Sequence, residues 1–196
     1  MIHPATTVRP VSPEIGNGVF ATEFIPCGTI IVVRDCCDLA LERDDFFALP
    51  AALRCSLETF MYHDKHGQLV LGWDHAKYMN HSCHSNTMMT DYGVEIVVRD
   101  IAAGEEVTSE YGLLNVQEPY ELYCNCVNCR GALRLDDIDR FAAQWDSQIL
   151  TALQRVAACP QPLVDLLVPE LYREILQLQH SPQHYRSVRG LKWRAS

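Results

Sequence analysis

Three cysteines stand within six residues, in the run Cys124-Asn125-Cys126-Val127-Asn128-Cys129. Disulfides between neighbours this close would be strained, whereas thiolates at such a spacing are typical of a tetrahedral Zn²⁺ site. Three ligands leave one coordination position open. Cys83 is the best candidate for the fourth ligand because it lies in another polar cluster. Cys36 and Cys37 lie in a leucine-bearing stretch, where we expect them to fill space.

The cysteine count also bears on location. Nine cysteines cannot all pair, and the N-terminus shows no basic segment followed by an apolar run. We therefore expect an intracellular protein, in the cytoplasm or the nucleus, whose thiols stay reduced. Hydrophobic residues make up 48% and charged residues 21% of the chain. No uninterrupted apolar run reaches about 18 residues, so we expect no membrane span.

Charge is distributed unevenly along the sequence. Residues 1–174 contain all 25 acidic and 12 of the 16 basic residues, a net charge of −13, whereas residues 175–196 carry +4. An acidic body favours basic partners and argues against direct nucleic-acid binding. A negative surface that merely keeps the protein soluble would give the same pattern.

Short β-strands dominate the first two thirds of the sequence. Residues 18–34 alternate β-branched and aromatic side chains on both sides of a turn at 26–28, and residues 65–67 resemble a hairpin turn between 59–62 and 68–72. Further strands are predicted at 94–98 and 105–111, and a helical stretch at 38–59. Short strands without alternating helices predict a mainly β fold of small sheets.

The C-terminal third has helical periodicity. Apolar residues recur every three or four positions over 138–156 and again over 163–178, and prolines separate the two runs. The sequence therefore predicts two helices as an appendage over residues 132–180. Residues 181–196 are basic and lack apolar periodicity, which favours a frayed, flexible tail.

Three further segments combine glycines or polar residues in unusual patterns. Gly16-Asn17-Gly18 permits a close backbone approach to a ligand, although a hairpin without a ligand has the same pattern. Residues 78–86 read YMNHSCHSN, which offers amides and imidazoles to a polar ligand or forms a polar surface loop. Residues 104–112 read GEEVTSEYG and end a short strand with Tyr111.

In order and spacing, the four segments resemble the SET-domain lysine methyltransferase family, whose pattern is G-x-G, N-H-S-C-x-P-N, G-E-E-L-T-x-x-Y and a post-SET cysteine cluster. The resemblance covers about residues 8–131. The C-x-C-x-x-C spacing is most similar to the branch that includes SET and MYND proteins, without a MYND insertion. Ser85 replaces the usual proline and Glu110 a frequent aspartate. Residues 132–196 match no family pattern.

The resemblance implies S-adenosylmethionine as the cofactor. The backbone of residues 17–20 would hold its methionine part, two polar side chains would bind its amino group and adenine, and one apolar side chain would pack against the adenine. Tyr123 is the alternative for this apolar position if the register differs by one residue. The implied cofactor-binding residues are Asn17, Gly18, Val19, Phe20, Asn80, His81, Tyr111 and Leu122.

The resemblance also implies a pseudoknot-like crossing that brings residues 80–83 beside Tyr111, although chains seldom thread. The zinc ligands would be Cys83, Cys124, Cys126 and Cys129, in a structural role. The expected domains are a SET domain at 1–119, a post-SET zinc segment at 120–131, the helical appendage at 132–180 and the basic tail at 181–196.

The implied activity is methyl transfer to the ε-amine of a lysine. A lysine in water has a pKa near 10.4, so the site must favour the neutral amine by burial and by the nearby sulfonium. Tyr111 would be the catalytic residue, as a neutral hydroxyl that positions the amine. A lysine-containing basic peptide, such as a histone-like tail, is the expected partner. Two alternatives stay open: a catalytically silent, zinc-stapled interaction module, and a methyltransferase of small-molecule amines.

Overall fold

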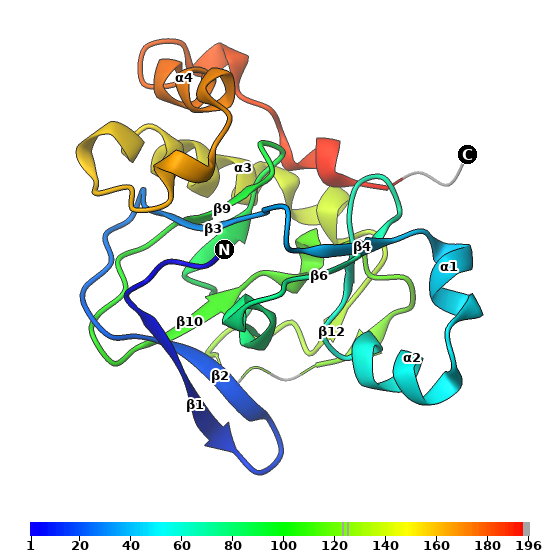
Figure 1. The fold of residues 1–196 in the computed structure, drawn as a ribbon. Coiled ribbons are helices and arrows are strands. Elements are labelled where there is room, and N and C mark those ends of the chain that lie inside the picture. The colour runs from blue at the N-terminus through cyan, green and yellow to red at the C-terminus, as the bar shows by residue number, and fades with distance from the viewer. Residues whose placement is uncertain (123, 125, 194–196) are drawn as a thin grey trace.

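The computed structural model describes residues 1–122, 124 and 126–193, and a curled sheet forms its centre (Figure 1). Within these residues the sheet has seven strands, in the order β1-β2-β10-β8-β9-β3, and β7 pairs with β10 beside this path. The strands are β1 (Thr6–Ser12), β2 (Gly16–Ala21), β3 (Ile30–Val33), β7 (Asn80–His81), β8 (Thr87–Met89), β9 (Val94–Val97) and β10 (Glu106–Ser109).

Strand β10 connects the two halves of this sheet. It runs antiparallel to β2 and parallel to β7 and β8. The consecutive strands β2 and β3 do not pair with each other, because β2 lies between β1 and β10 while β3 pairs with β9. The parallel pairing of β7 with β10 brings residues 80–81 beside 108–109, two positions before Tyr111, which the resemblance placed beside residues 80–83.

A second, small sheet with two helices packs beside the main sheet (Figure 1). The predicted hairpin is present as β5 and β6, and the predicted helical stretch at 38–59 begins with a strand, β4, before its two helices. Pro50 separates these helices, as expected from its missing N–H. The bounds are β4 (Leu39–Leu41), α1 (Arg43–Ala48), α2 (Ala51–Glu58), β5 (Tyr62–His63) and β6 (Leu69–Leu71).

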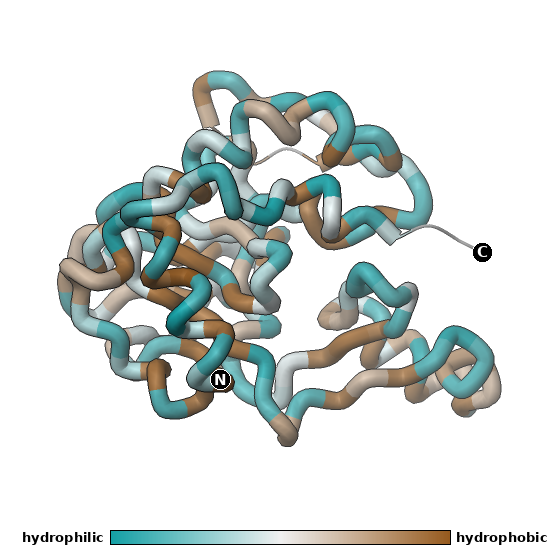
Figure 2. Tube along the Cα trace, turned by 90° about the horizontal axis from the view of Figure 1, so that it is seen from above, coloured by the Kyte–Doolittle hydropathy of each residue, from teal (hydrophilic) through white to brown (hydrophobic). Residues whose placement is uncertain are grey.

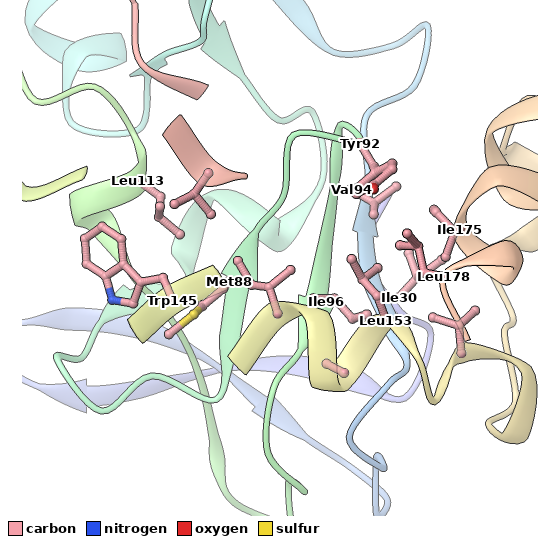
Figure 3. Packing of buried hydrophobic residues seen from close by; sticks show 14 of the residues in the cluster. Ile30, Met88, Tyr92, Val94, Ile96, Leu113, Trp145, Leu153, Ile175 and Leu178 are labelled. Atoms are coloured by element: carbon pink, nitrogen blue, oxygen red, sulfur yellow. The ribbon is translucent and has the colours of Figure 1, made fainter. Parts of the chain in front are cut away.

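The C-terminal helices cover one face of the main sheet. Helix α3 (Asp137–Leu153) buries Trp145 and Ile149 against the strands, and α4 (Pro169–Gln177) adds Ile175 to the same core (Figure 3). The second helix is shorter than the apolar run predicted, because residues 164–166 form a separate 3-10 turn. Hydrophobic stretches lie mainly in the interior strands, and the outer loops are largely hydrophilic (Figure 2).

The fold prediction of small β-sheets followed by C-terminal helices is confirmed. A further two-stranded sheet joins β11 (Tyr120–Glu121) to β12 (Ala132–Leu133), on either side of the cysteine run. In the part of the chain that the structure describes, every helix is too short or too polar to cross a bilayer.

The C-terminal tail is packed as far as residue 193, which differs from the frayed segment that the sequence predicted. Two 3-10 helices occupy 182–184 and 188–191, and Val188 and Leu191 are buried. The Trp193 ring stacks on His63 of β5, with centroids 5.8 Å apart. Two buried apolar side chains and one aromatic contact hold the segment, and they follow no helical or strand periodicity that the sequence could have revealed. Residues 194–196 lie outside the described residues.

Candidate active site

Tyr111 follows β10 directly and lies against the residues that precede and form β7. The Glu110 carboxylate caps the 3-10 turn by accepting from Gly112 N at 2.8 Å, which sets the direction of the chain after the strand. The Tyr111 backbone N–H donates to His81 Nδ1 at 3.2 Å, and its phenol donates to Met79 O at 2.6 Å. The predicted approach of the phenol to the N-H-S-C segment is therefore present.

The glycine segment meets the same strand from the other side. The Asn80 amide donates to Asn17 O at 3.1 Å and to Glu106 Oε1 at 2.8 Å. A Cβ atom on Gly18 would lie 2.5 Å from Glu106 Oε1 and 3.0 Å from Asn80 Nδ2. A larger residue at position 18 would have to displace the Glu106 and Asn80 side chains, and Gly16, at the start of β2, has a φ of 84°.

The remaining predicted cofactor residues have different surroundings. Val19 is fully buried in the sheet core. Phe20 is half-buried, and the guanidinium carbon of Arg9 lies 4.1 Å from the centroid of the Phe20 ring. Leu122 lies on the cysteine segment, where its N–H donates to Gly131 O at 3.2 Å. Tyr123, the alternative to Leu122, lies outside the described residues.

Four cysteine sulfurs converge, three from the run at 124–129 and one from Cys83. The Sγ atoms of Cys83, Cys124, Cys126 and Cys129 all lie within 4.8 Å of one another. Cys124 Sγ is 3.3 Å from Cys126 Sγ and 3.6 Å from Cys129 Sγ. Four thiolates around one Zn²⁺ at about 2.3 Å have sulfurs about 3.8 Å apart, so the donor set and its spacing fit a closed tetrahedral zinc site.

Backbone amides surround this cluster. N–H groups of Cys83, Cys124, Arg130 and Gly131 each point to a cysteine sulfur at 3.3 to 3.5 Å. Such N–H···S bonds favour thiolates, which are the form that binds a metal. The cluster is joined to the tyrosine segment because His81 Nε2 lies 3.3 Å from Cys83 Sγ.

Arg130 and Glu110 form a buried ion pair between the cysteine segment and the core. The two guanidinium nitrogens lie 2.8 and 2.7 Å from the two carboxylate oxygens, and the Glu110 side chain is 0% exposed. The guanidinium carbon also lies 4.8 Å from the Phe141 centroid and 5.6 Å from that of Trp145. Helix α3 thereby contributes to the support of the candidate site.

Burial keeps the two central side chains neutral at pH 7. Burial, with Arg130 nearby, lowers the pKa of His81 to about 4. Burial also raises the pKa of Tyr111 well above its usual range, and neighbouring acidic groups add to this shift. Neither side chain carries a charge, so both act through hydrogen bonds and position.

A cavity of about 830 Å³ adjoins the Tyr111 phenol. It lies between the main sheet and the small sheet with its two helices, and several aromatic side chains are among the residues that line it. Tyr62, Tyr120 and Phe60 come from the small sheet and the flanking segments, and Leu191 from the C-terminal segment. The cavity can hold an extended alkyl side chain that reaches toward the phenol.

A family model described as the SET domain matches residues 16–112. This chain contains a SET domain. Many solved structures are similar, and two of them are the following. A candidate histone methyltransferase of Plasmodium falciparum aligns with 20% identity and a TM-score of 0.41, over 56% of this chain and 95% of that one. KRYPTONITE, in complex with mCHG DNA and SAH, aligns with 21% identity and a TM-score of 0.43, over 63% of this chain and 28% of that one. Among curated proteins, none matches.

The match over residues 16–112 includes three of the four segments from which the resemblance was inferred, and it supports an S-adenosylmethionine-dependent methyltransferase. It ends just after the tyrosine, so the cysteine segment and the helical appendage lie beyond it. The match therefore identifies neither the methyl acceptor nor a metal.

Several residues of the SET domain and its flanks were missed from the sequence. Glu106 fixes Asn80, Arg130 neutralises Glu110, and Asn86 binds the β10 backbone through Thr108 N at 2.8 Å and Glu106 O at 2.8 Å. Asn86 ends the polar segment at 78–86, so its position in that run was the available signal. Arg130 directly follows the last cysteine, but nothing in the sequence indicated its partner.

The expectation for Cys36 and Cys37 was wrong. Both side chains are exposed, because they lie in the turn between β3 and β4 and not in an apolar element. Their thiols lie near the Asp35 carboxylate. That carboxylate already binds the N-terminal ammonium at 2.8 Å and Trp73 Nε1 at 3.0 Å.

Proposed function

We propose that this chain is a protein-lysine N-methyltransferase that uses S-adenosylmethionine. The observation that carries the proposal is the position of the Tyr111 phenol: hydrogen-bonded to Met79 O beside Asn80 and His81, it also borders a large cavity. One tyrosine thus contacts the predicted cofactor-binding loop and the space for a substrate side chain.

The residues around β7 fit the proposed cofactor. The Asn80 amide donates to the Asn17 carbonyl, next to the close contact at Gly18. We propose that the polar backbone groups at this point bind the amino acid part of the cofactor. Asn17, Gly18, Val19 and Phe20 would bind this moiety, and Asn80, His81 and Leu122 the amino group and the adenine. When bound, the cofactor supplies an electrophilic methyl group on a sulfonium.

Zinc in this proposal is structural. Cys83, Cys124, Cys126 and Cys129 would hold it with four thiolates, which leaves no coordination position for a water molecule. Because Cys83 follows β7 and the other three follow β11, the metal would tie the C-terminal segment to the cofactor loop. The chain's own residues then enclose the reaction and exclude water.

Tyr111 positions the reacting amine. Its hydroxyl proton is donated to Met79 O, so the phenol oxygen keeps lone pairs that can accept a hydrogen bond from an amine. The raised pKa of Tyr111 keeps its phenol protonated at neutral pH, so no phenolate is available as a base and its contribution is orientation and electrostatic stabilisation. The acidic body, with −13 over residues 1–174, supports a basic peptide as the substrate.

Isothermal titration with S-adenosylmethionine is the first test, with zinc-loaded protein. Binding is expected, and its absence would remove the proposal. Labelled cofactor is then incubated with a histone and peptide library and, separately, with small amines. Methyl transfer to lysine in peptides supports the proposal. Transfer to small amines alone would show that the acceptor is a small molecule. Cofactor binding without transfer to either would indicate an interaction module.

A further inference from the structure

Glu95 is a buried carboxyl at the wall of the cavity. It lies in the middle of β9, where side chains alternate between the two faces of the sheet. Val94 and Ile96 point into the core beneath the C-terminal helices (Figure 3). Glu95 therefore points the other way, where it lines the cavity with Tyr111 and is only 6% exposed.

Two hydroxyls lie beside this carboxyl, one from the adjacent strand β8 and one from β10, the next strand beyond it. Thr87 Oγ1 is 2.6 Å from Glu95 Oε1 and 3.0 Å from Thr108 O. The Ser109 hydroxyl is directly adjacent and lines the cavity, yet it has no hydrogen bond of normal geometry within the part of the chain that the structure describes. Ser109 is 3% exposed, so an unpaired polar group faces the cavity at this point.

The Thr87 contacts accommodate both protonation states of Glu95. A hydroxyl has one proton, so Thr87 Oγ1 cannot donate to both oxygens at once. When Glu95 is ionised, Thr87 donates to the carboxylate. When Glu95 is protonated, its O–H donates to Thr87 Oγ1, and Thr87 donates to Thr108 O. A proton can therefore be gained or lost without leaving a buried polar group unpaired.

No cation neutralises Glu95, since the ion pairs formed by residues 1–122, 124 and 126–193 do not include it. Burial raises its pKa, an effect that the hydrogen bond from the Thr87 hydroxyl opposes. The titratable side chains that face it are Tyr62 from β5 and Tyr111, both kept neutral by burial. Beyond them, the charged groups around Tyr62 are Arg34, Asp38 and Asp64.

We propose that Glu95 receives the acceptor amine and takes its proton: the ammonium N–H bond breaks, an O–H bond forms on the carboxylate, and a neutral amine remains beside Tyr111. The proton stays on Glu95, hydrogen-bonded to Thr87, until solvent removes it as the product leaves. Ser109 supplies a further hydrogen bond to the amine. This inference rests on the proposed function, and it names the group that makes an amine reactive in this cavity.

The first experiment measures amine binding without any cofactor. The probe is n-butylammonium, titrated into protein with ¹³C-labelled glutamate side chains and followed by NMR, with 1-butanol as the uncharged comparison. Glu95→Gln is expected to weaken butylammonium binding roughly 10- to 100-fold and to leave butanol binding unchanged. Glu118→Gln is the matched control, because Glu118 lines the same cavity from an exposed position.

The sign of the pH dependence follows from the carboxyl. Wild-type affinity for butylammonium rises as pH increases through the pKa of Glu95, because only the ionised form receives the cation. The affinity falls again as the probe loses its own proton near pH 10.4. Thr87→Val keeps the carboxyl and the side-chain volume but removes the relay hydroxyl, so it is expected to move this profile to higher pH. This variant keeps the test decisive if Glu95→Gln does not fold.

The second experiment measures methyl transfer across pH. Glu95→Gln is expected to lose kcat/KM near pH 7 and to recover as pH approaches the pKa of the amine. The inference about Glu95 would be overturned if wild type and Glu95→Gln bound butylammonium equally well, or if Thr87→Val left the pH profile of binding unchanged. Neither result would contradict the proposed methyltransferase function. Ionisation-dependent binding of butylammonium without any methyl transfer would support the Glu95 site and remove the proposed function.

Discussion

Replacing Arg130 by methionine removes the only ion-pair partner that Glu110 has at hydrogen-bond distance in the described residues. The Glu110 carboxylate is 0% exposed and Arg130 16% exposed, and two bonds of 2.8 and 2.7 Å join them. Breaking a buried pair by removing one partner costs about 3–5 kcal/mol, because an uncompensated charge stays buried. Gly112 N still donates to this carboxylate, so we expect the free energy of unfolding to fall by about 3 kcal/mol, the lower end of this range.

Methionine keeps the length and apolar character of the side chain, so the contacts with Phe141 and Trp145 lose only their cationic component, about 0.5–1 kcal/mol each. A double variant that also carries Glu110→Gln removes the charge of Glu110 and is expected to recover part of the loss, because the buried Asp137 carboxylate, 3.7 Å from Arg130, also loses this partner. Arg173→Met is the matched control. The pair of Arg173 with Glu170 is 65% and 70% exposed, which limits its contribution to about 0–1 kcal/mol.

The assay is urea unfolding of zinc-loaded protein, monitored by tryptophan fluorescence, in which Trp145 is a reporter next to the altered residue. Free energies of unfolding are compared at equal denaturant slope. A loss below about 1 kcal/mol for Arg130→Met, equal to that of Arg173→Met, would refute the assignment of Glu110 as a buried charge that needs this partner.

Three further substitutions test the candidate site. Tyr111→Phe is expected to reduce turnover about 10²- to 10³-fold while titration shows unchanged cofactor binding; retained turnover would remove the phenol from the mechanism. Cys124→Ser is expected to lose bound zinc by metal analysis and to weaken cofactor binding; wild-type zinc content would contradict the ligand set. Gly18→Ala is expected to weaken cofactor binding at least tenfold because its Cβ would displace Asn80, whereas Gly72→Ala, with 4.0 Å of clearance, serves as the unaffected control.

Periodicity predicted the helices better than the strand pairing. The apolar positions of α3, from Ile138 to Leu153, were readable because one face of a helix packs on one surface. The partner of each strand was not readable, since β2 pairs with β1 and β10 while the next strand along the chain, β3, pairs with β9. Pairing of distant strands depends on the whole fold, and no local pattern specifies it.

The candidate site was predicted where the chain places chemistry in consecutive residues. The four cysteines and the Asn80-His81 pair lie in dense polar runs, and the structure brings them together with Tyr111. Residues that act alone were missed: Arg130 and Glu110 lie 20 positions apart, and their pairing follows from the crossing of two segments.

Glu95 shows how burial on both faces of a strand removes the signal that sequence analysis uses. In the predicted strand at 94–98, a glutamate between Val94 and Ile96 has the alternation of a half-exposed strand, whose polar residues face water. The small sheet with α1 and α2 packs over that face, so the position that the pattern assigns to solvent becomes part of a cavity wall. A carboxyl is costly there unless it is neutral or receives a cation, and the adjoining Tyr111 is where an amine would arrive. The same packing that hid Glu95 from the sequence therefore gives it a chemical role to test.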